Sequence, residues 1–354
     1  MKRYLVLENG TVFEGNAFGA DRDVIAEIVF NTAVTGYVET LSDARYIGQA
    51  ICQTFPLIGN YGVNESDADG VPVCVSAYIV RELSDIASNF RSEGELDAYL
   101  KKYNVPGLSG IDTRKLTKLL RDEGTMNGMI TSDPAKADLD AIRNFRITKA
   151  VEAASTKEVY TEGDGSIKLA LLDLGSKNGI IRDLVRHGAS VTVFPHTASA
   201  DEILAINPDG IVLSGGPGDP AECGMEVYTV KALLDSGIPM LAIGLGHQLL
   251  ALANGFSTTK LKHGHRGGSY PTKTSEESGR LYITAQNHGY AVASETVDPT
   301  VAEEIFRNIN DKSNEGLLYK NIPAISVQFT PAAITGPNDT DFVYDRFFKM
   351  LELK

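Results

Sequence analysis

The sequence predicts an α/β protein in which an N-terminal α+β domain precedes a doubly wound domain with a mostly parallel sheet. Its 354 residues are enough for two hydrophobic cores. Residues 1–151 contain short strand signals separated by turns, together with two helical patterns. From residue 167 onward, strand and helix signals alternate at the spacing typical of parallel sheets. We place the first domain at 1–151, a polar linker at 152–166 and the second domain at 167–354.

The first domain opens with three strand patterns, expected at 4–7, 11–14 and 24–30, each ended by a turn residue. Two helices are expected at 95–103 and 115–123. Asp112 and Thr113 are suitable N-cap residues for the second helix, and Gly124 is suited to end it.

The second domain is expected to alternate regularly between strands and helices. The strands are expected at 168–173, 190–194, 210–213 and 240–243. The helices are expected at 177–187, 200–206 and 226–236, with a further one beginning near Gly246. The carboxyl ends of parallel strands meet at one edge of the sheet. Loops 175–176 and 214–220 and the bend at Gly244 are therefore expected to form the site.

The composition excludes several classes of function. A net charge of −13, with no run of basic residues, argues against nucleic-acid binding. The three cysteines form no CxxC pair, so neither a disulfide framework nor a cysteine zinc site is expected. No apolar run approaches the roughly 18 residues of a membrane span, and the N-terminus reads as a first strand. We expect a cytoplasmic protein that does not contact a membrane.

The most informative segment is 239–255, where an apolar strand bends at Gly244 into an apolar helix. Elbows of this kind hold a Ser or Cys nucleophile in a strained turn at a helix N-terminus. The helix dipole lowers a thiol's pKa there, and nearby N–H groups stabilise an oxyanion. Gly244 has no side chain with which to attack. On the same helix, His247 is expected to hydrogen-bond a neighbouring loop rather than to take part in chemistry.

Two further segments leave alternatives open. Loop 214–220 follows a buried-type strand, and its glycines would let backbone amides approach a ligand. It lacks the spacing of a nucleotide-phosphate loop, and a tight structural turn accounts for it equally well. Segment 285–290 similarly fits a polar site loop or a simple turn.

Three histidines invite a metal-binding interpretation. His263 and His265 would share one face of a strand, and His288 follows later in the chain. No Asp, Glu or Cys at ligand spacing completes the set, and segment 263–268 reads as a turn. We therefore expect no metal site in this chain.

Taken together, these segments resemble a class I (triad-type) glutamine amidotransferase domain in order and spacing. Four segments of the N-terminal half narrow the resemblance to the small subunit of carbamoyl phosphate synthetase. These segments are 29–39, 55–60, 87–91 and 110–121. The resemblance covers essentially the whole chain.

The resemblance implies an activity and a partner. Small subunits of this family hydrolyse glutamine through a cysteinyl thioester and pass the ammonia through a tunnel to a large subunit. The large subunit uses ATP to make carbamoyl phosphate from bicarbonate, for pyrimidine and arginine biosynthesis. The implied partner of this chain is that large subunit, and the implied ligand is glutamine or a related small molecule. The chain itself is expected to hold no cofactor, because ATP and Mg belong to the large subunit.

The catalytic positions depart from the family pattern. The family elbow reads Gly-Ile-Cys-Leu-Gly-His-Gln, whereas this chain has Ala-Ile-Gly-Leu-Gly-His-Gln, so Gly244 stands at the position of the cysteine. Thr330 and Ala332 stand at the positions of the histidine and the glutamate of the family's His-Pro-Glu. All three positions of the triad are therefore changed.

The substrate-binding positions are partly retained. Arg45 stands where the family has a small serine that meets the substrate, so a long cation could obstruct glutamine or select another ligand. Ser269 and Tyr270 also depart from the usual Asn-His. The retained positions are Gly216 and Gly218 of the glutamine loop, Leu245 as oxyanion donor, Gln248 as a substrate contact, and Asn287, Gly289 and Tyr290 around the glutamine backbone.

These changes predict a small subunit without glutaminase activity, whose complex depends on free ammonia. The alternative is a non-catalytic, regulatory protein that senses a small acidic metabolite through Arg45. A third interpretation, glutaminase activity through another nucleophile, finds little support. Cys223 is expected to be a buried, inert thiol, and Thr330 has no adjacent histidine to activate it.

Overall fold

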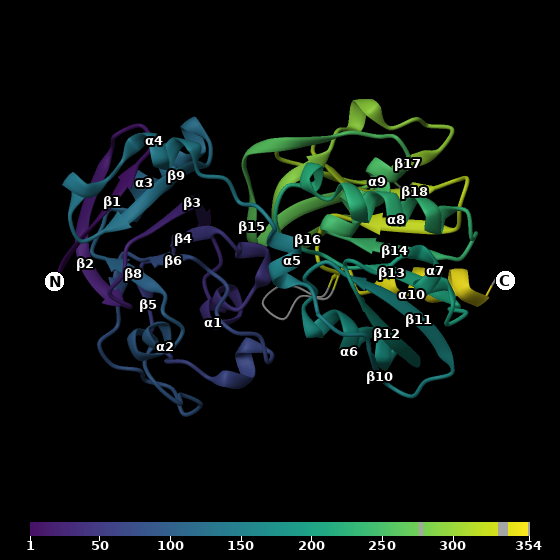
Figure 1. Ribbon diagram of the computed structural model, residues 1–354, viewed down its shortest axis with the longest axis horizontal. Helices are drawn as coiled ribbons and strands as arrows, with labels where there is room; N and C mark the ends of the chain where they lie inside the picture. Colours follow the sequence, from purple (N-terminus) through teal and green to yellow (C-terminus); the bar gives the residue numbers. More distant parts are fainter. Residues whose placement is uncertain (276–278, 332–338, 353–354) are drawn as a thin grey trace. The chain divides into compact units, whose positions relative to one another are not determined.

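The computed structural model describes residues 1–275, 279–331 and 339–352 (Figure 1). The chain divides into two compact units, Met1–Thr148 and Lys149–Lys354. In the described ranges, no helix has the length and apolar character needed to cross a membrane.

Unit 1 is built on a closed barrel with strand order β1-β2-β8-β6-β4-β3-β9. The barrel closes because β1 pairs with both β2 and β9. Its strands are β1 (Lys2–Leu7), β2 (Val12–Gly19), β3 (Val24–Asn31), β4 (Gln49–Gln53), β6 (Ala77–Ile79), β8 (Pro106–Ser109) and β9 (Met126–Thr131). A separate pair consists of β5 (Leu57–Ile58) and β7 (Glu82–Leu83). The three strands expected from the sequence are present, and the mixture of strands and helices confirms the α+β class.

The helices of unit 1 are short. They are α1 (Tyr37–Leu41), α2 (Leu96–Lys102), α3 (Thr113–Glu123) and α4 (Leu139–Asn144), with 3₁₀ turns at Ala44–Tyr46, Glu65–Ala68 and Pro134–Lys136. The expected capping of α3 is confirmed, because Asp112 accepts a hydrogen bond of 2.9 Å from the Lys115 N–H. Gly124 ends the helix with φ +104°.

Unit 2 is a ten-stranded sheet in the order β10-β12-β11-β13-β14-β19-β18-β17-β15-β16. Its parallel part runs from β12 to β19. The strands are β10 (Tyr160–Glu162), β11 (Ile167–Asp173), β12 (Ala189–Pro195), β13 (Gly210–Leu213), β14 (Met240–Ile243), β15 (Thr258–Thr274), β16 (Leu281–Val292), β17 (Ala302–Asn308), β18 (Asn314–Tyr319) and β19 (Ala324–Val327). The helices are α5 (Ala150–Ala154), α6 (Asn178–Arg186), α7 (Ala200–Leu204), α8 (Gly224–Leu234), α9 (Leu245–Ala253) and α10 (Phe342–Glu352), with 3₁₀ turns at Pro220–Glu222 and Ser294–Thr296.

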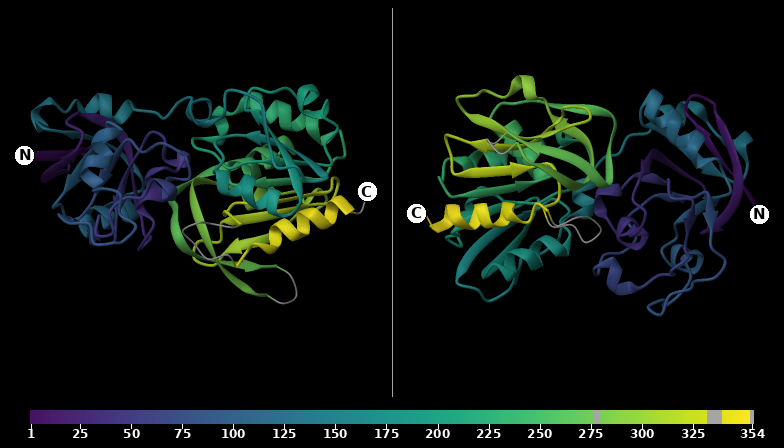
Figure 2. Two further views of the ribbon diagram at one scale, coloured as in Figure 1. Left: turned by 90° about the horizontal axis from the view of Figure 1, so that it is seen from below. Right: turned by 180° about the vertical axis from the view of Figure 1, so that it is seen from behind.

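Helices cover both faces of the parallel part, as expected for a doubly wound sheet (Figures 1 and 2). Along β11, Ala170 and Leu172 pack into the core that α8 and α9 share. Leu169 and Leu171 point the other way, into the core formed with α6 and α10. Successive side chains of a strand face opposite sides, so a strand buried on both faces is an almost unbroken apolar run. This is why β11, β13 and β14 were visible in the sequence.

The sheet continues beyond β19 as an antiparallel extension of β18, β17, β15 and β16. Segment 263–268, predicted as a turn, and segment 285–290, predicted as either a polar site loop or a turn, instead lie inside β15 and β16. The pairing of these two strands shifts register between Lys260 and His265 and again between Gly267 and Tyr270. Gly264 has φ +68°, which glycine adopts without strain. These irregularities, and the many polar residues, hide both strands from a reading based on periodicity.

The segment expected to be a linker carries regular structure and belongs to unit 2. Helix α5 occupies residues 150–154, and its Val151 packs into the core shared by α8 and α9. Strand β10 forms an antiparallel edge against β12. The polar composition of residues 152–166 therefore reflects a solvent-facing edge of the unit.

Candidate functional site

The elbow expected at Gly244 is present. Gly244 joins β14 to α9 with φ +58° and ψ −113°, and its N–H donates to the Val327 carbonyl at 2.8 Å. Two residues later, a Cβ on Gly246 would lie 2.4 Å from the Leu213 carbonyl oxygen. The first turn of α9 can therefore lie against β13 only because residue 246 is glycine. Backbone packing thus determines the shape of the elbow.

The elbow has room for a side chain that it lacks. A Cβ on Gly244 would meet only the Gly215 Cα at 3.4 Å and the Gln328 carbonyl oxygen at 3.9 Å, both ordinary contacts. The obstacle at this position is the positive φ, which L-residues adopt only with strain. A strained, accessible position at a helix N-terminus is where a nucleophile would stand.

The loop after β13 lies against the elbow, as expected. The Gly246 N–H donates to the Ser214 carbonyl at 3.0 Å. A Cβ on Gly216 would lie 2.2 Å from the Leu174 carbonyl oxygen and 3.0 Å from the Leu245 Cδ2, so residue 216 must be glycine. Gly218 has φ +93°, which also favours glycine. The structure thus brings Gly216 next to Leu245, the first residue of α9.

Gln248 connects the elbow helix to two other segments. Its Nε2 donates to the Tyr290 carbonyl and to the Gln328 Oε1, both at 2.9 Å. Tyr290 lies on β16 with Asn287 and Gly289, so the structure brings this part of the expected substrate segment to α9. The Gln328 Nε2 is buried and has no hydrogen-bond partner among the described residues. No motif in the sequence marks Gln328 as a site residue, although it directly follows the buried strand β19.

The positions expected for the base and its carboxylate show no acid–base pair. Thr330 is buried and forms an isolated bridge in which its N–H donates to the Ala285 carbonyl at 3.0 Å. A threonine hydroxyl is not a base near neutral pH. Ala332 lies outside the described residues.

His247 does not replace the missing base. Its ring is fully buried, with Nδ1 2.8 Å from the Ser326 Oγ on β19, so its partner is a strand residue and not the loop that we expected. Burial lowers the pKa of His247 to about 3, and the imidazole is therefore neutral at physiological pH.

Cys223 does not replace the missing nucleophile. Its thiol is buried, and this burial raises the pKa to about 12. A neutral, inaccessible thiol is a poor nucleophile, as we expected for this residue.

Arg45 belongs to unit 1, in the 3₁₀ turn Ala44–Tyr46. Its Nη2 lies 2.6 Å from the Asp43 Oδ2, and its Nε lies 2.9 Å from the Asp43 Oδ1. The Asp43 carboxylate is almost wholly buried, so the two groups form a neutral, bidentate pair. Arg45 therefore does not present the unpaired cation that the metabolite-sensing alternative requires.

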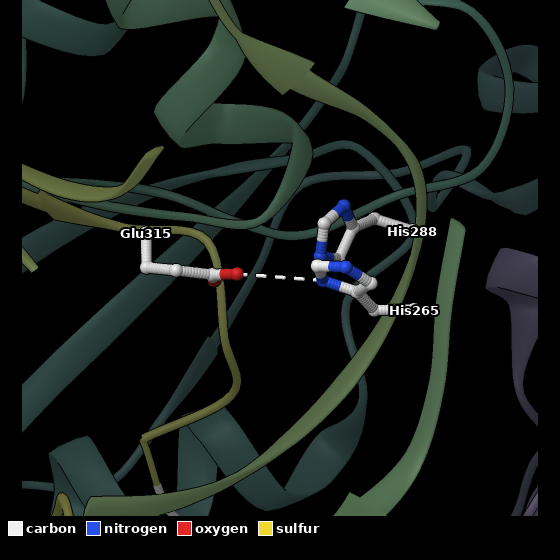
Figure 3. Close-up of side chains that lie close together, drawn as sticks. All are labelled: His265, His288 and Glu315. Carbon is white, nitrogen blue, oxygen red and sulfur yellow. Dashed lines mark ion pairs between the residues drawn. The ribbon is translucent and has the colours of Figure 1, made fainter. Parts of the chain in front are cut away.

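Of the three histidines considered for a metal site, two come together. His265 and His288 face each other across β15 and β16, and Glu315 of β18 joins them (Figure 3). His263 is not part of this group, and its Nδ1 lies 2.9 Å from the Gly264 carbonyl. No nearby carboxylate in the sequence predicted the group, because Glu315 arrives from a distant strand. The only local sequence signal was an acidic residue, Glu315, close to the apolar Leu317 and Leu318 of the same strand.

Comparison with known proteins assigns the class of the fold and then the family. The class-I glutamine amidotransferase family matches residues 170–350, the part of the chain that contains the elbow. The family of the carbamoyl-phosphate synthase small chain, CPSase domain, matches residues 5–130.

Curated relatives match the whole chain. The carbamoyl phosphate synthase small chain of Listeria monocytogenes is 43% identical over 357 residues, covering 100% of this chain and 98% of the relative. That of Clostridium perfringens is 46% identical over 351 residues, covering 99% of each chain. The chain therefore belongs to the carbamoyl phosphate synthase small chain family, which confirms the resemblance drawn from its motifs.

Proposed function

We propose that this chain is a carbamoyl phosphate synthetase small subunit that binds the large subunit but no longer hydrolyses glutamine. The observation that carries the proposal is Gly244 at the bend of an intact nucleophile elbow. A cysteinyl thioester requires a thiol at this point, and glycine offers no atom to form the bond. Synthesis by the complex then depends on free ammonia.

The residues around Gly244 also support the loss of glutamine hydrolysis. The base position holds Thr330, and the pKa of His247 is too low for a general base at neutral pH. The pKa of Cys223 keeps its thiol protonated. Triad members act as a unit, so losing nucleophile and base together costs several orders of magnitude in rate.

The retained scaffold supports the role as a subunit. The barrel of unit 1, the glycine loop and the elbow are intact, although the groups that act on glutamine are absent. In this proposal ATP and Mg are bound by the large subunit and not by this chain, and the complex is cytoplasmic and supplies pyrimidine and arginine biosynthesis.

The alternative of a regulatory, metabolite-binding pseudo-glutaminase is less well supported. It relies on Arg45 to bind an acidic metabolite, and the Arg45 guanidinium already pairs with the Asp43 carboxylate. In addition, the side-chain amide of Gln248 donates hydrogen bonds to Tyr290 and Gln328, so its N–H groups are not available to a ligand in this arrangement.

The test is to coexpress the chain with the large synthetase chain of the same organism, purify the complex and measure carbamoyl phosphate formed from ammonium or glutamine. We expect normal turnover with ammonium and at least a roughly thousandfold lower rate with glutamine. If turnover with glutamine were as fast as turnover with ammonium, the proposed loss of glutaminase activity would be wrong. Failure of the two chains to copurify would contradict the role as a subunit and favour the regulatory alternative.

The matched control is a complex carrying Gly244→Cys, Thr330→His and Ala332→Glu together. A gain of glutamine-driven turnover in this variant locates the defect in the triad. If ammonium turnover is normal and the gain is absent, the pocket itself no longer admits glutamine.

A further inference from the structure

The antiparallel extension of unit 2 contains a buried cluster of ionisable side chains that the glutaminase chemistry does not use. His265 on β15, His288 on β16 and Glu315 on β18 each offer one ligand atom, and these atoms all lie within 4.8 Å of one another (Figure 3). All three side chains are buried, and Glu315 is completely inaccessible. The cluster joins the consecutive strands β15 and β16 to β18, which comes later in the chain.

The outward nitrogen of each histidine is already held by an oxygen acceptor. The His265 Nε2 lies 2.7 Å from the Asp311 Oδ2, and the His288 Nδ1 lies 2.7 Å from the Tyr290 carbonyl. Metal-binding histidines are characteristically oriented in this way, with the other ring nitrogen bound to a carboxylate or a backbone carbonyl. These contacts turn the His265 Nδ1 and the His288 Nε2 toward the inside of the cluster.

The inner atoms converge on a common point. The Gln286 Oε1 lies between the two ring nitrogens, 2.6 Å from the His265 Nδ1 and 3.0 Å from the His288 Nε2. The Glu315 Oε1 lies 3.4 Å from the same His265 nitrogen. Its second oxygen, Oε2, is buried and has no hydrogen-bond partner in the part of the chain that the structure describes. An unpartnered carboxylate oxygen in the interior is costly unless a cation or donor binds it.

We propose that His265, His288 and Glu315 bind a zinc-type divalent transition-metal ion, with the Gln286 amide oxygen as a fourth neighbour. Two imidazoles and a carboxylate form a ligand set that zinc uses. In tetrahedral zinc sites the ligand atoms are about 3.3 Å apart, so closure needs side-chain shifts of roughly 1 Å or less. The site is structural, because its buried ligands come from β15, β16 and β18 and would crosslink these strands.

A proton is the competitor for this site. Burial acts to lower the pKa of His265, but hydrogen bonds from its ring to Asp311 and Glu315 outweigh burial and raise the pKa to about 9. Near pH 7 the metal must displace this proton, so its apparent affinity should rise with pH.

The test uses the full-length, untagged chain after treatment with a chelator, and its probes are Co²⁺ and Zn²⁺ alone. We expect one Co²⁺ per chain with the intense visible absorption of a tetrahedral site, displacement by Zn²⁺, and a raised unfolding temperature with either ion. Absence of any binding at about 100 μM of either ion would overturn the proposal.

Two variants and a control locate the site. Glu315→Gln keeps the shape of the side chain, and we expect it to weaken Zn²⁺ binding by at least tenfold, as we also expect for His288→Gln. His263→Gln removes a histidine from the same strand outside the cluster and should leave binding unchanged. Equal binding by all three variants, or loss only in the control, would place the ion elsewhere.

X-ray absorption of the zinc-loaded wild-type chain tests the site even where a variant fails to fold. We expect nitrogen and oxygen neighbours at about 2.0–2.1 Å. A sulfur neighbour at about 2.3 Å would assign the ion to a cysteine and refute the proposed ligands.

Discussion

The elbow at Gly244 and the cluster around His265 belong to the same sheet, but they differ in what is complete. One has its backbone geometry without reactive side chains, and the other has its polar side chains on an irregular backbone. At the elbow the backbone geometry is complete and the reactive side chains are absent. In the cluster the polar side chains are complete, and the backbone around them is irregular. The elbow is maintained by close backbone packing at Gly246, which does not depend on a catalytic side chain. The cluster is maintained by its own side chains, so losing one member should disturb the rest.

The largest effect should follow from breaking the cluster. We expect Glu315→Ala to lower the free energy of unfolding of the metal-free chain by about 3–5 kcal/mol, because it leaves the buried His265 without one of its two carboxylates. Urea unfolding followed by circular dichroism measures the change. Glu315→Gln is the matched control and should cost less, because it still accepts from Asn308 and Ser313. If Glu315→Ala lowered the free energy of unfolding by less than about 1 kcal/mol, the side chains of the cluster would not be stabilising one another.

The next effect tests whether packing alone maintains the elbow. We expect Gly246→Ala to lower the free energy of unfolding by about 3 kcal/mol. Its Cβ would lie 2.4 Å from the Leu213 carbonyl oxygen, and only a backbone shift can relieve that contact. Gly244→Ala is the control and should cost only about 1–2 kcal/mol, since it adds backbone strain without overlap. Both values come from denaturant unfolding. If the two variants were destabilised equally, backbone strain and not close packing would limit which residues the elbow tolerates.

A smaller effect should appear in the pH dependence of stability. The pKa of His247 is about 3 in the folded chain and about 6.5 when it is exposed. Below pH 6.5 the unfolded chain therefore binds a proton that the folded chain does not, and stability falls as the pH drops from about 6.5 toward 3. The slope is at most about 1.4 kcal/mol per pH unit.

The control for this slope is His247→Asn, which can still hydrogen-bond Ser326 but does not titrate. Its free energy of unfolding should depend less steeply on pH than that of the wild type between pH 6.5 and 5. Identical slopes would mean that His247 becomes protonated in the folded state.

The smallest effect on the fold should come from refilling the elbow. We expect Gly244→Cys to cost about 1 kcal/mol and to react with a thiol reagent faster than the buried Cys223, because position 244 is only partly buried. Glutamine hydrolysis should remain absent, because Thr330 is not a base. A coupled glutamate assay measures it, and turnover by this single variant would contradict the requirement for the whole triad.

The sequence predicted the region of the elbow better than the region of the buried cluster. The parallel strands, the elbow and the contact between its helix and loop 214–220 were all predicted, because apolar runs and glycine positions are local signals. Strand β15 was mistaken for a turn at 263–268, and 285–290 of β16 was left open between a site loop and a turn, because bulges and polar residues obscure a period of two. The linker expected at 152–166 overlaps the end of α5 and contains β10, since a polar edge strand resembles a loop in composition.

The sequence by itself determined the family, the two-domain order and the absence of a nucleophile at Gly244, because each depends on residue identity at positions close together in the chain. Only the tertiary structure decided the rest. It turned His247 toward Ser326 and brought Glu315 to His265 and His288. These contacts depend on strand order and register, which join residues tens of positions apart, and local patterns do not encode which distant side chain will arrive.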